Sequence, residues 1–290
     1  MPMTAHTQLC LGPHGFYKLA YSRWAPRAAG GPPVVCVHGL TRNGRDFDAL
    51  AEHLSDGRLV VAPDMPGRGL SGFLPVATDY GYPLYLGAVA ALIGSLESET
   101  IDFVGTSMGG IIGMMLASQP NSPIRRLVLN DVGGLIPKAA LERIGSYAGQ
   151  GEEFDDLAAV EAYFRRVAAS FGRLTDAQWR SMALHGHRRL ANGKLALAYD
   201  PAIALPFHGE QNDVELWPVY DLIRCPTLVI RGAQSDLLLA ETAAEMTRRG
   251  PRATLFEVPD AGHAPALLAD NQIATIAHFL NEGSLERLPQ

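Results

Sequence analysis

The fold of this chain is decided by one stretch, Ile101-Asp102-Phe103-Val104-Gly105-Thr106-Ser107-Met108-Gly109-Gly110-Ile111-Ile112-Gly113. An apolar run ends at Gly105, and a run of small and apolar residues suited to a helix begins after Gly109. The pattern predicts a strand, a sharp turn and a helix, with Ser107 at the apex of the turn. Such a turn strains the backbone of Ser107, so the residues two positions away on either side must be small, and glycine occupies both. We therefore expect the Ser107 hydroxyl to stand clear of the sheet as a candidate nucleophile.

Further apolar runs of strand length lie on both sides of this stretch. They occupy 34–37, 59–62, 127–129, 227–230 and 254–258, and each ends in a loop with polar or glycine residues. Helical patterns at 46–55, 82–97, 110–119, 240–249 and 271–280 lie between and after them, and a hairpin at 8–11 and 16–24 precedes them. Alternating strands and helices predict an α/β fold with a mainly parallel sheet covered by helices on both faces. In such sheets the working residues gather at the carboxyl ends of the strands.

The alternation stops between Leu135 and Trp217. Amphipathic helical patterns at 138–147, 157–171 and 176–190 fill this interval. We expect residues 135–217 to form a helical cap, or lid, inserted over the strand ends, with residues 1–134 and 218–290 forming the core. The cap is rich in aromatic residues, most of which would hold the cap together, and Trp179 is a candidate for the substrate pocket.

Composition excludes several classes of function. The 290 residues are 47% hydrophobic and 19% charged, as in an ordinary globular protein, and the net charge of -6 without a basic stripe argues against a nucleic-acid partner. Neither a signal peptide nor an uncharged run long enough to span a bilayer is evident, so we expect no membrane partner. The 3 cysteines are scattered, which favours reduced thiols and a cytoplasmic location. Histidines at metal-ligand spacing are not found, so no metal is expected. The oligomeric state is left open, a homodimer included.

A serine hydroxyl needs a base to take its proton, and a histidine base needs a carboxylate to hold it in one tautomer. Ser107, Asp236 and His263 each lie on a loop just after a strand candidate, in this order along the chain. Asp131 also ends a strand, directly after the helix that follows Ser107, and is the alternative acid. We favour Asp236 and interpret Asp131 as a residue that caps the next turn or lines the pocket. His38 is a further pocket candidate, although its commoner role in such a loop is to brace the turn.

With these motifs the chain resembles the α/β-hydrolase superfamily, in the esterase-like branch with a helical cap. The motifs are Val-His-Gly-Leu at 37–40, Asp-Met-Pro-Gly-Arg-Gly-Leu-Ser at 64–71, Gly-Thr-Ser-Met-Gly-Gly at 105–110, Gly-Ala-Gln-Ser-Asp at 232–236 and Gly-His at 262–263. The resemblance covers nearly the whole chain outside the cap. It implies the α/β-hydrolase fold, Ser107 as nucleophile, His263 as base and then acid, and Asp236 as its orienting carboxylate. It also implies an oxyanion hole formed by the backbone amides of Leu40 and Met108, and no cofactor.

The implied function is that of a serine hydrolase that cleaves small to medium, largely apolar carboxylic esters through an acyl-enzyme on Ser107. Carbon–carbon bond hydrolases of the meta-cleavage product type and lactonases use the same triad and are the alternatives. A non-catalytic ligand receptor of the same fold is a more remote alternative. A protein that only binds a ligand would readily lose one triad residue, whereas this chain has candidates for all three. The run 130–141 also resembles proteobacterial hydrolases of mostly unassigned substrate, and a hydroxyacyl oligomer is one candidate substrate.

Overall fold

An eight-stranded sheet forms the centre of the computed structural model, which describes residues 3–28 and 30–285. At one edge β1 (Thr4–Gly12) and β2 (Gly15–Trp24) form an antiparallel hairpin, and β2 pairs antiparallel with β4 (Val60–Pro63). From β4 onward the pairing is parallel in the order β4-β3-β5-β6-β12-β13. The remaining strands of this part are β3 (Val34–Val37), β5 (Ile101–Thr106), β6 (Ile124–Asn130), β12 (Thr227–Gly232) and β13 (Thr254–Val258). The predicted α/β fold with a mainly parallel sheet is confirmed.

Helices cover both faces of the sheet because its central strands are apolar on both sides. In β3 the side chains of Val34 and Cys36 pack with α1 (Asp48–Leu54) and α9 (Asp270–Glu282) on one face. Val35 and Val37 join the larger core on the opposite face. That core includes residues of α2 (Tyr82–Gly94), α3 (Met108–Ala117) and α8 (Ala240–Met246). All four β3 residues are fully buried, as expected for a strand between two helical layers.

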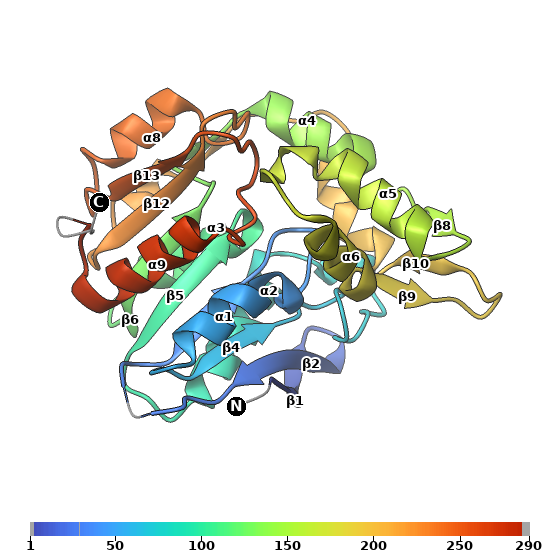
Figure 1. Cartoon of the computed structure of the whole chain (residues 1–290), viewed down its shortest axis with the longest axis horizontal. Helices are drawn as coiled ribbons and strands as arrows, with labels where there is room; N and C mark the ends of the chain where they lie inside the picture. The colour runs from blue at the N-terminus through green and yellow to red at the C-terminus, as the bar shows by residue number, and fades with distance from the viewer. Residues whose placement is uncertain (1–2, 29, 286–290) are drawn as a thin grey trace.

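The segment between β6 and β12 lies to one side of the sheet, over the region of the strand ends (Figure 1). It holds α4 (Lys138–Tyr147), α5 (Leu157–Val167), α6 (Asp176–His185) and the short α7 (Trp217–Tyr220). Short strands accompany these helices: β7 (Leu135–Ile136) pairs with β11 (Val214–Glu215), and β8 (Glu153–Phe154), β10 (Leu195–Leu197) and β9 (His187–Arg189) form a small sheet. The same segment contains the 3-10 helices η3 (Ala169–Phe171) and η4 (Pro201–Phe207). Two more 3-10 helices, η1 (Gly44–Phe47) and η2 (Ala77–Asp79), belong to the core. We call residues 135–217 the cap, and its exact boundaries stay a prediction.

Two cap helices are shorter than their sequence patterns indicate. The helix predicted over 157–171 ends at Val167, before the separate turn η3. A helix over 176–190 is predicted, but α6 ends at His185 with Gly186 as its C-cap, and His187 begins β9. The strand forms because residues 187–189 pair antiparallel with residues 195–197 around a tight turn that contains Asn192 and Gly193. An Asn-Gly pair between short runs is a strong hairpin signal, and it outweighs the helical periodicity here.

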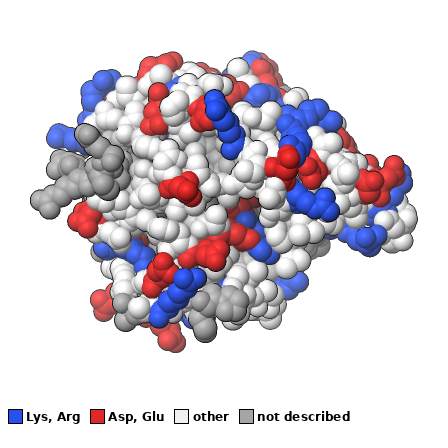
Figure 2. Space-filling model, in the orientation of Figure 1, with Lys and Arg blue, Asp and Glu red and all other residues white. Residues whose placement is uncertain are grey.

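Charged side chains of both signs occur together on the surface of the protein. On the face shown in Figure 2, basic and acidic side chains are interspersed and no broad basic area is visible. Within residues 3–28 and 30–285, no helix combines the length and the apolar character needed to cross a membrane.

Candidate active site

Ser107 lies at the turn between β5 and α3 with a positive φ of 52°, a conformation that is strained for a residue with a side chain. The two flanking glycines are required by close backbone approach. A Cβ on Gly109 would lie 2.0 Å from the carbonyl oxygen of Val37, and a Cβ on Gly105 would lie 2.4 Å from the carbonyl oxygen of Gly109. The predicted sharp turn with small neighbours is therefore present, and it holds the Ser107 side chain at the carboxyl end of β5.

A continuous chain of hydrogen bonds runs from this serine to a buried carboxylate. Ser107 Oγ lies 3.0 Å from His263 Nε2, and His263 Nδ1 lies 2.7 Å from Asp131 Oδ2. A carboxylate only accepts, so the Nδ1 nitrogen carries the proton and Nε2 is free to accept from the serine. Asp131 is fully buried and also accepts from Ser235 Oγ at 2.5 Å and from the backbone N–H of Gly232 at 2.8 Å. The imidazole is thus held in the tautomer that general-base chemistry needs.

The prediction that Asp236 orients His263 is wrong. Asp236 ends a turn after β12 in which the N–H of Ser235 donates to Gly232, and its half-exposed side chain reaches the cap. There Arg143 of α4 donates through Nε and Nη2 to both carboxylate oxygens, the second bond being 2.9 Å long. Asp131, by contrast, leaves β6 with a positive φ of 56° that directs its carboxylate to the imidazole. β6 lies next to β5 in the sheet, so the carboxyl end that carries Asp131 is adjacent to the serine turn.

Leu40 and Met108 lie beside Ser107, as an oxyanion hole requires. Met108 directly follows Ser107 as the first residue of α3, and a Cβ on Gly39, next to Leu40, would lie 3.7 Å from the Ser107 Cβ. Their amides stay the predicted donors to the oxyanion.

Arg68 braces this region and was missed by the sequence analysis. The side chain is fully buried, and its Nε donates to the Leu40 carbonyl at 2.9 Å while Nη2 lies 3.6 Å from Met108 Sδ. Its Nη1 donates to Tyr85 Oη at 2.8 Å, and the guanidinium lies 4.9 Å from the centre of the Tyr85 ring. A charged residue within a glycine-rich turn was the available signal. Arg68 therefore joins the two loops that carry the predicted oxyanion donors.

His38 and Asp64 are structural residues of the same loops. His38 is fully buried, donates from Nδ1 to the Gly39 carbonyl at 2.7 Å and accepts at Nε2 from the Met65 N–H at 2.9 Å. Burial lowers the pKa of His38 to about 3, so the ring stays neutral at physiological pH. Asp64 accepts from the N–H groups of Gly44 and Leu70, both at 2.8 Å, which fixes the turn that follows β4.

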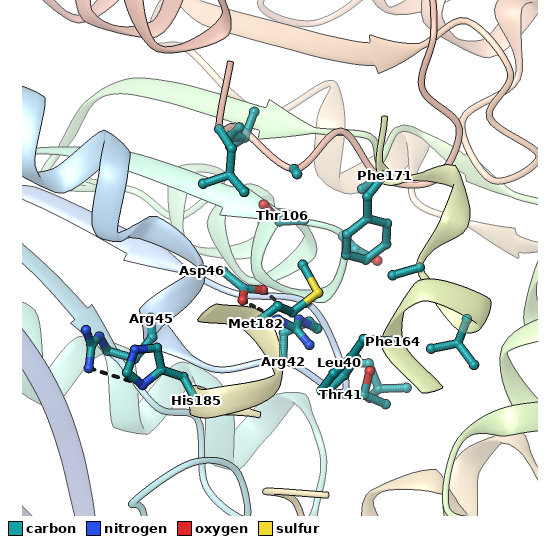
Figure 3. Close-up of a pocket in the computed structure, with 18 of the residues that line it drawn as sticks. Leu40, Thr41, Arg42, Arg45, Asp46, Thr106, Phe164, Phe171, Met182 and His185 are labelled. Atoms are coloured by element: carbon teal, nitrogen blue, oxygen red, sulfur yellow. Dashed lines mark hydrogen bonds and ion pairs between the residues drawn. The ribbon is translucent and has the colours of Figure 1, made fainter. Parts of the chain in front are cut away.

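A cavity of about 330 Å³ opens beside Ser107 and His263, between core and cap. Its lining includes Phe164, Phe171 and Met182 of the cap and Leu40, Thr41 and Arg42 of the core, which are labelled in Figure 3. The three residues predicted to line a pocket do not line it: His38 and Asp131 are buried behind it, and Trp179 packs inside the cap, where Arg165 lies 5.6 Å from its ring.

The arginines of the core side of the cavity are neutralised by neighbouring carboxylates. Arg42 donates to both oxygens of Asp46, and Arg45 donates to both oxygens of Asp48 (the first pair is drawn in Figure 3). Arg45 also lies 3.4 Å from His185 Nδ1. Burial and the Arg45 charge lower the pKa of His185, which favours its neutral form. In the part of the chain that the structure describes, no three His, Cys, Asp or Glu side chains are grouped so as to hold a metal ion.

The η3 turn of the cap holds the loop that carries the histidine. The Ser170 hydroxyl donates to the His263 carbonyl at 2.9 Å, and the Gly262 N–H donates to the Ser170 carbonyl at 2.6 Å. On the core side, Asn130 Nδ2 donates to the Pro265 carbonyl at 2.8 Å. The position of the imidazole thus depends on contacts to both cap and core.

The comparison with family models agrees with this architecture. Residues 32–270 match the model described as the alpha/beta hydrolase fold. The chain belongs to this family.

Two curated relatives are similar to this chain over most of their length. The chain is 44% identical over 283 residues to the 3-hydroxybutyrate-oligomer hydrolase of Cupriavidus necator, an alignment that covers 93% of this chain and 95% of the relative. It is 30% identical to the 2-(acetamidomethylene)succinate hydrolase of Mesorhizobium japonicum, over 80% of this chain and 82% of that protein. Among solved structures, a putative hydrolase from Rickettsia typhi superposes with a TM-score of 0.89 at 32% identity, covering 98% of this chain and all of the other. The fold is that of hydrolytic enzymes, and the chain is a hydrolase.

Proposed function

We propose that this hydrolase cleaves carboxylic esters by acyl transfer through Ser107, with His263 as the base and Asp131 as the carboxylate that orients it. The observation that carries the proposal is the unbroken series of hydrogen bonds from Ser107 Oγ through His263 to the buried Asp131. That series supplies a nucleophile, a base in the required tautomer and a compensating charge for the imidazolium.

The mechanism has two steps. Ser107 Oγ attacks the ester carbonyl carbon while His263 Nε2 takes the hydroxyl proton, and the resulting oxyanion accepts hydrogen bonds from the amides of Leu40 and Met108. The carbon–oxygen bond to the alcohol breaks, and the alcohol leaves with the proton from His263. Water then attacks the acyl-enzyme and gives a proton to His263. The bond between the acyl carbon and Ser107 Oγ breaks, His263 returns the proton to Oγ, and the acid is released. No cofactor takes part in either step.

Short linear esters of 3-hydroxy acids are the substrate class we propose. The support is the relative that is named a 3-hydroxybutyrate-oligomer hydrolase and is 44% identical over nearly the whole of both chains. A cavity of about 330 Å³ with apolar walls suits a short, methyl-branched acyl group. We further propose that the enzyme acts in the cytoplasm, which is supported by its free Cys10, Cys36 and Cys225.

The test is a hydrolysis screen combined with covalent labelling. The enzyme should hydrolyse p-nitrophenyl butyrate and the linear dimer of 3-hydroxybutyrate, with a lactone and a meta-cleavage product as comparison substrates for the alternative activities. A fluorophosphonate should label Ser107 once, and Ser107→Ala should lose both labelling and turnover while its thermal melt stays within a few degrees of the wild type. Labelling at another residue, or an active Ser107→Ala variant, would contradict the assignment.

A further inference from the structure

Asp236 has a position that the acyl-transfer mechanism does not use. It follows β12 in the core and forms a two-bond ion pair with Arg143 of the cap helix α4. Arg143 is among the residues that line the cavity beside Ser107. Its side chain is 37% exposed, so solvent reaches part of this stretch of the cavity wall. The ion pair therefore connects core and cap at an open part of the cavity.

The guanidinium of Arg143 retains donors that Asp236 does not occupy. A guanidinium has five N–H groups. Asp236 accepts at Nε and Nη2, which leaves both N–H groups of Nη1 and the outer N–H of Nη2 facing away from it. These groups form a second fork, which matches the two oxygens of a carboxylate.

The other arginines of the cavity are less suited to receive an anion. Three arginines line it: Arg42, Arg45 and Arg143. The Arg42 side chain is only 8% exposed, and its Nη1 is sealed from solvent without a partner, while Phe164 lies 4.7 Å from its guanidinium carbon. Arg45 uses Nε and Nη2 on Asp48 and Nη1 on His185. The Arg143 side chain is the most exposed of the three, at 37% against 29% for Arg45, and Tyr147 of the same helix lies beside its guanidinium.

We propose that Arg143 anchors the free carboxylate of an acidic ester substrate, and that Asp236 holds the guanidinium in place for this contact. The inference rests on the proposed hydrolysis of hydroxy-acid esters. A carboxylate is costly to bury against the apolar wall formed by residues such as Phe171 and Met182, so it needs a charged partner at the edge of the cavity. In a linear dimer of 3-hydroxybutyrate the carboxylate belongs to the alcohol part, so Arg143 binds the leaving group and acts before the acyl-enzyme forms.

The experiment compares two substrates that share one acyl group. One is the linear 3-hydroxybutyrate dimer, and the other is the same dimer with its carboxylate converted to a carboxamide. Both give the same acyl-enzyme, so a difference between them reports binding of the leaving group. Arg143→Gln should lower kcat/KM for the acidic dimer by about tenfold or more and change kcat/KM for the carboxamide by less than about twofold.

A matched control lies on the same helix. Lys138 on α4 is also partly exposed and ion-paired, with its Nζ 3.5 Å from Glu142, but it does not line the cavity. Lys138→Gln should leave the ratio of the two substrates unchanged.

Failure of the anchor and failure of the proposed function give different results. Equal losses on both substrates in Arg143→Gln, or an equal change in Lys138→Gln, would overturn the anchor. If the enzyme cleaves p-nitrophenyl butyrate but not the dimer, the proposed oligomer substrate is wrong. The anchor is then decided by inhibition of that assay, where 3-hydroxybutyrate should inhibit the wild type more strongly than 3-hydroxybutyramide, and Arg143→Gln should abolish the difference. No difference in the wild type would overturn it.

Discussion

Replacing Asp131 by asparagine tests the acid of the site most directly, because the contacts of this residue dictate how an amide would sit. One carboxylate oxygen accepts from the backbone N–H of Gly232 at 2.8 Å, and this donor cannot move. The amide oxygen of the introduced asparagine must take that place, so its NH₂ group faces His263 Nδ1, which lies 2.7 Å from the other oxygen now. An N–H group in this position forces Nδ1 to accept and moves the ring proton to Nε2. Nε2 then has no lone pair for the proton of Ser107.

The magnitude follows from the loss of the base. A comparable exchange in a serine protease triad, with the geometry intact, lowers kcat about 10⁴-fold, or about 5 kcal/mol of transition-state stabilisation. Asp131 is fully buried and accepts three hydrogen bonds, from His263, Ser235 and Gly232, so no water can replace the lost interaction. We expect Asp131→Asn to lose at least three orders of magnitude in kcat on p-nitrophenyl butyrate.

The assay pairs this variant with Asp236→Asn. Both are measured on the neutral ester p-nitrophenyl butyrate, and both are melted to confirm that they fold. Asp236→Asn should keep kcat within about threefold of the wild type, because its carboxylate contacts Arg143 and not the imidazole. An inactive Asp236→Asn beside an active Asp131→Asn would refute the reasoning.

Two further predictions concern stability. Burial lowers the pKa of His38 to about 3, against about 6.5 in an unfolded chain, so the unfolded state binds the extra proton and stability is lost as the pH falls from 6.5 towards 3. At pH 5 this loss is about 2 kcal/mol relative to pH 8, so the drop in Tm from pH 8 to pH 5 should be smaller in His38→Asn than in the wild type. The raised pKa of Asp64 affects the wild type and the variant alike, so it cancels in the comparison. Equal drops in Tm for the two proteins would contradict the argument. Asp102 is fully buried between Arg58 and Arg125, so Asp102→Asn leaves two guanidinium groups undercompensated. It should lower the free energy of unfolding in urea by about 3–5 kcal/mol, and a loss below about 1 kcal/mol would show that these charges are screened.

Much of the site was predictable from the sequence because it depends on local constraints. The sharp turn at Ser107 requires small neighbours, and these appear in the sequence as glycines. The continuous apolar run before the turn requires helices on both faces of its strand, so the layered fold could also be predicted. The partnership of Ser107 with His263 follows from strand order and is confirmed as a contact of 3.0 Å. The role of Arg68 is different. The residues that Arg68 contacts belong to separate segments of the chain, and no spacing in the sequence indicates that they meet.

The choice between the two aspartates could not be made from the residues because both follow strands of the same sheet. What decides it is backbone geometry: Asp131 has a positive φ, while Asp236 lies beyond a turn closed by Ser235 N–H on Gly232. Residue 235 donates from its hydroxyl to Asp131, and the next residue pairs with Arg143 of the cap. The segment 232–236 thus supports the acid without supplying it. The motif that suggested the wrong acid therefore connects the cap to the carboxylate that holds His263.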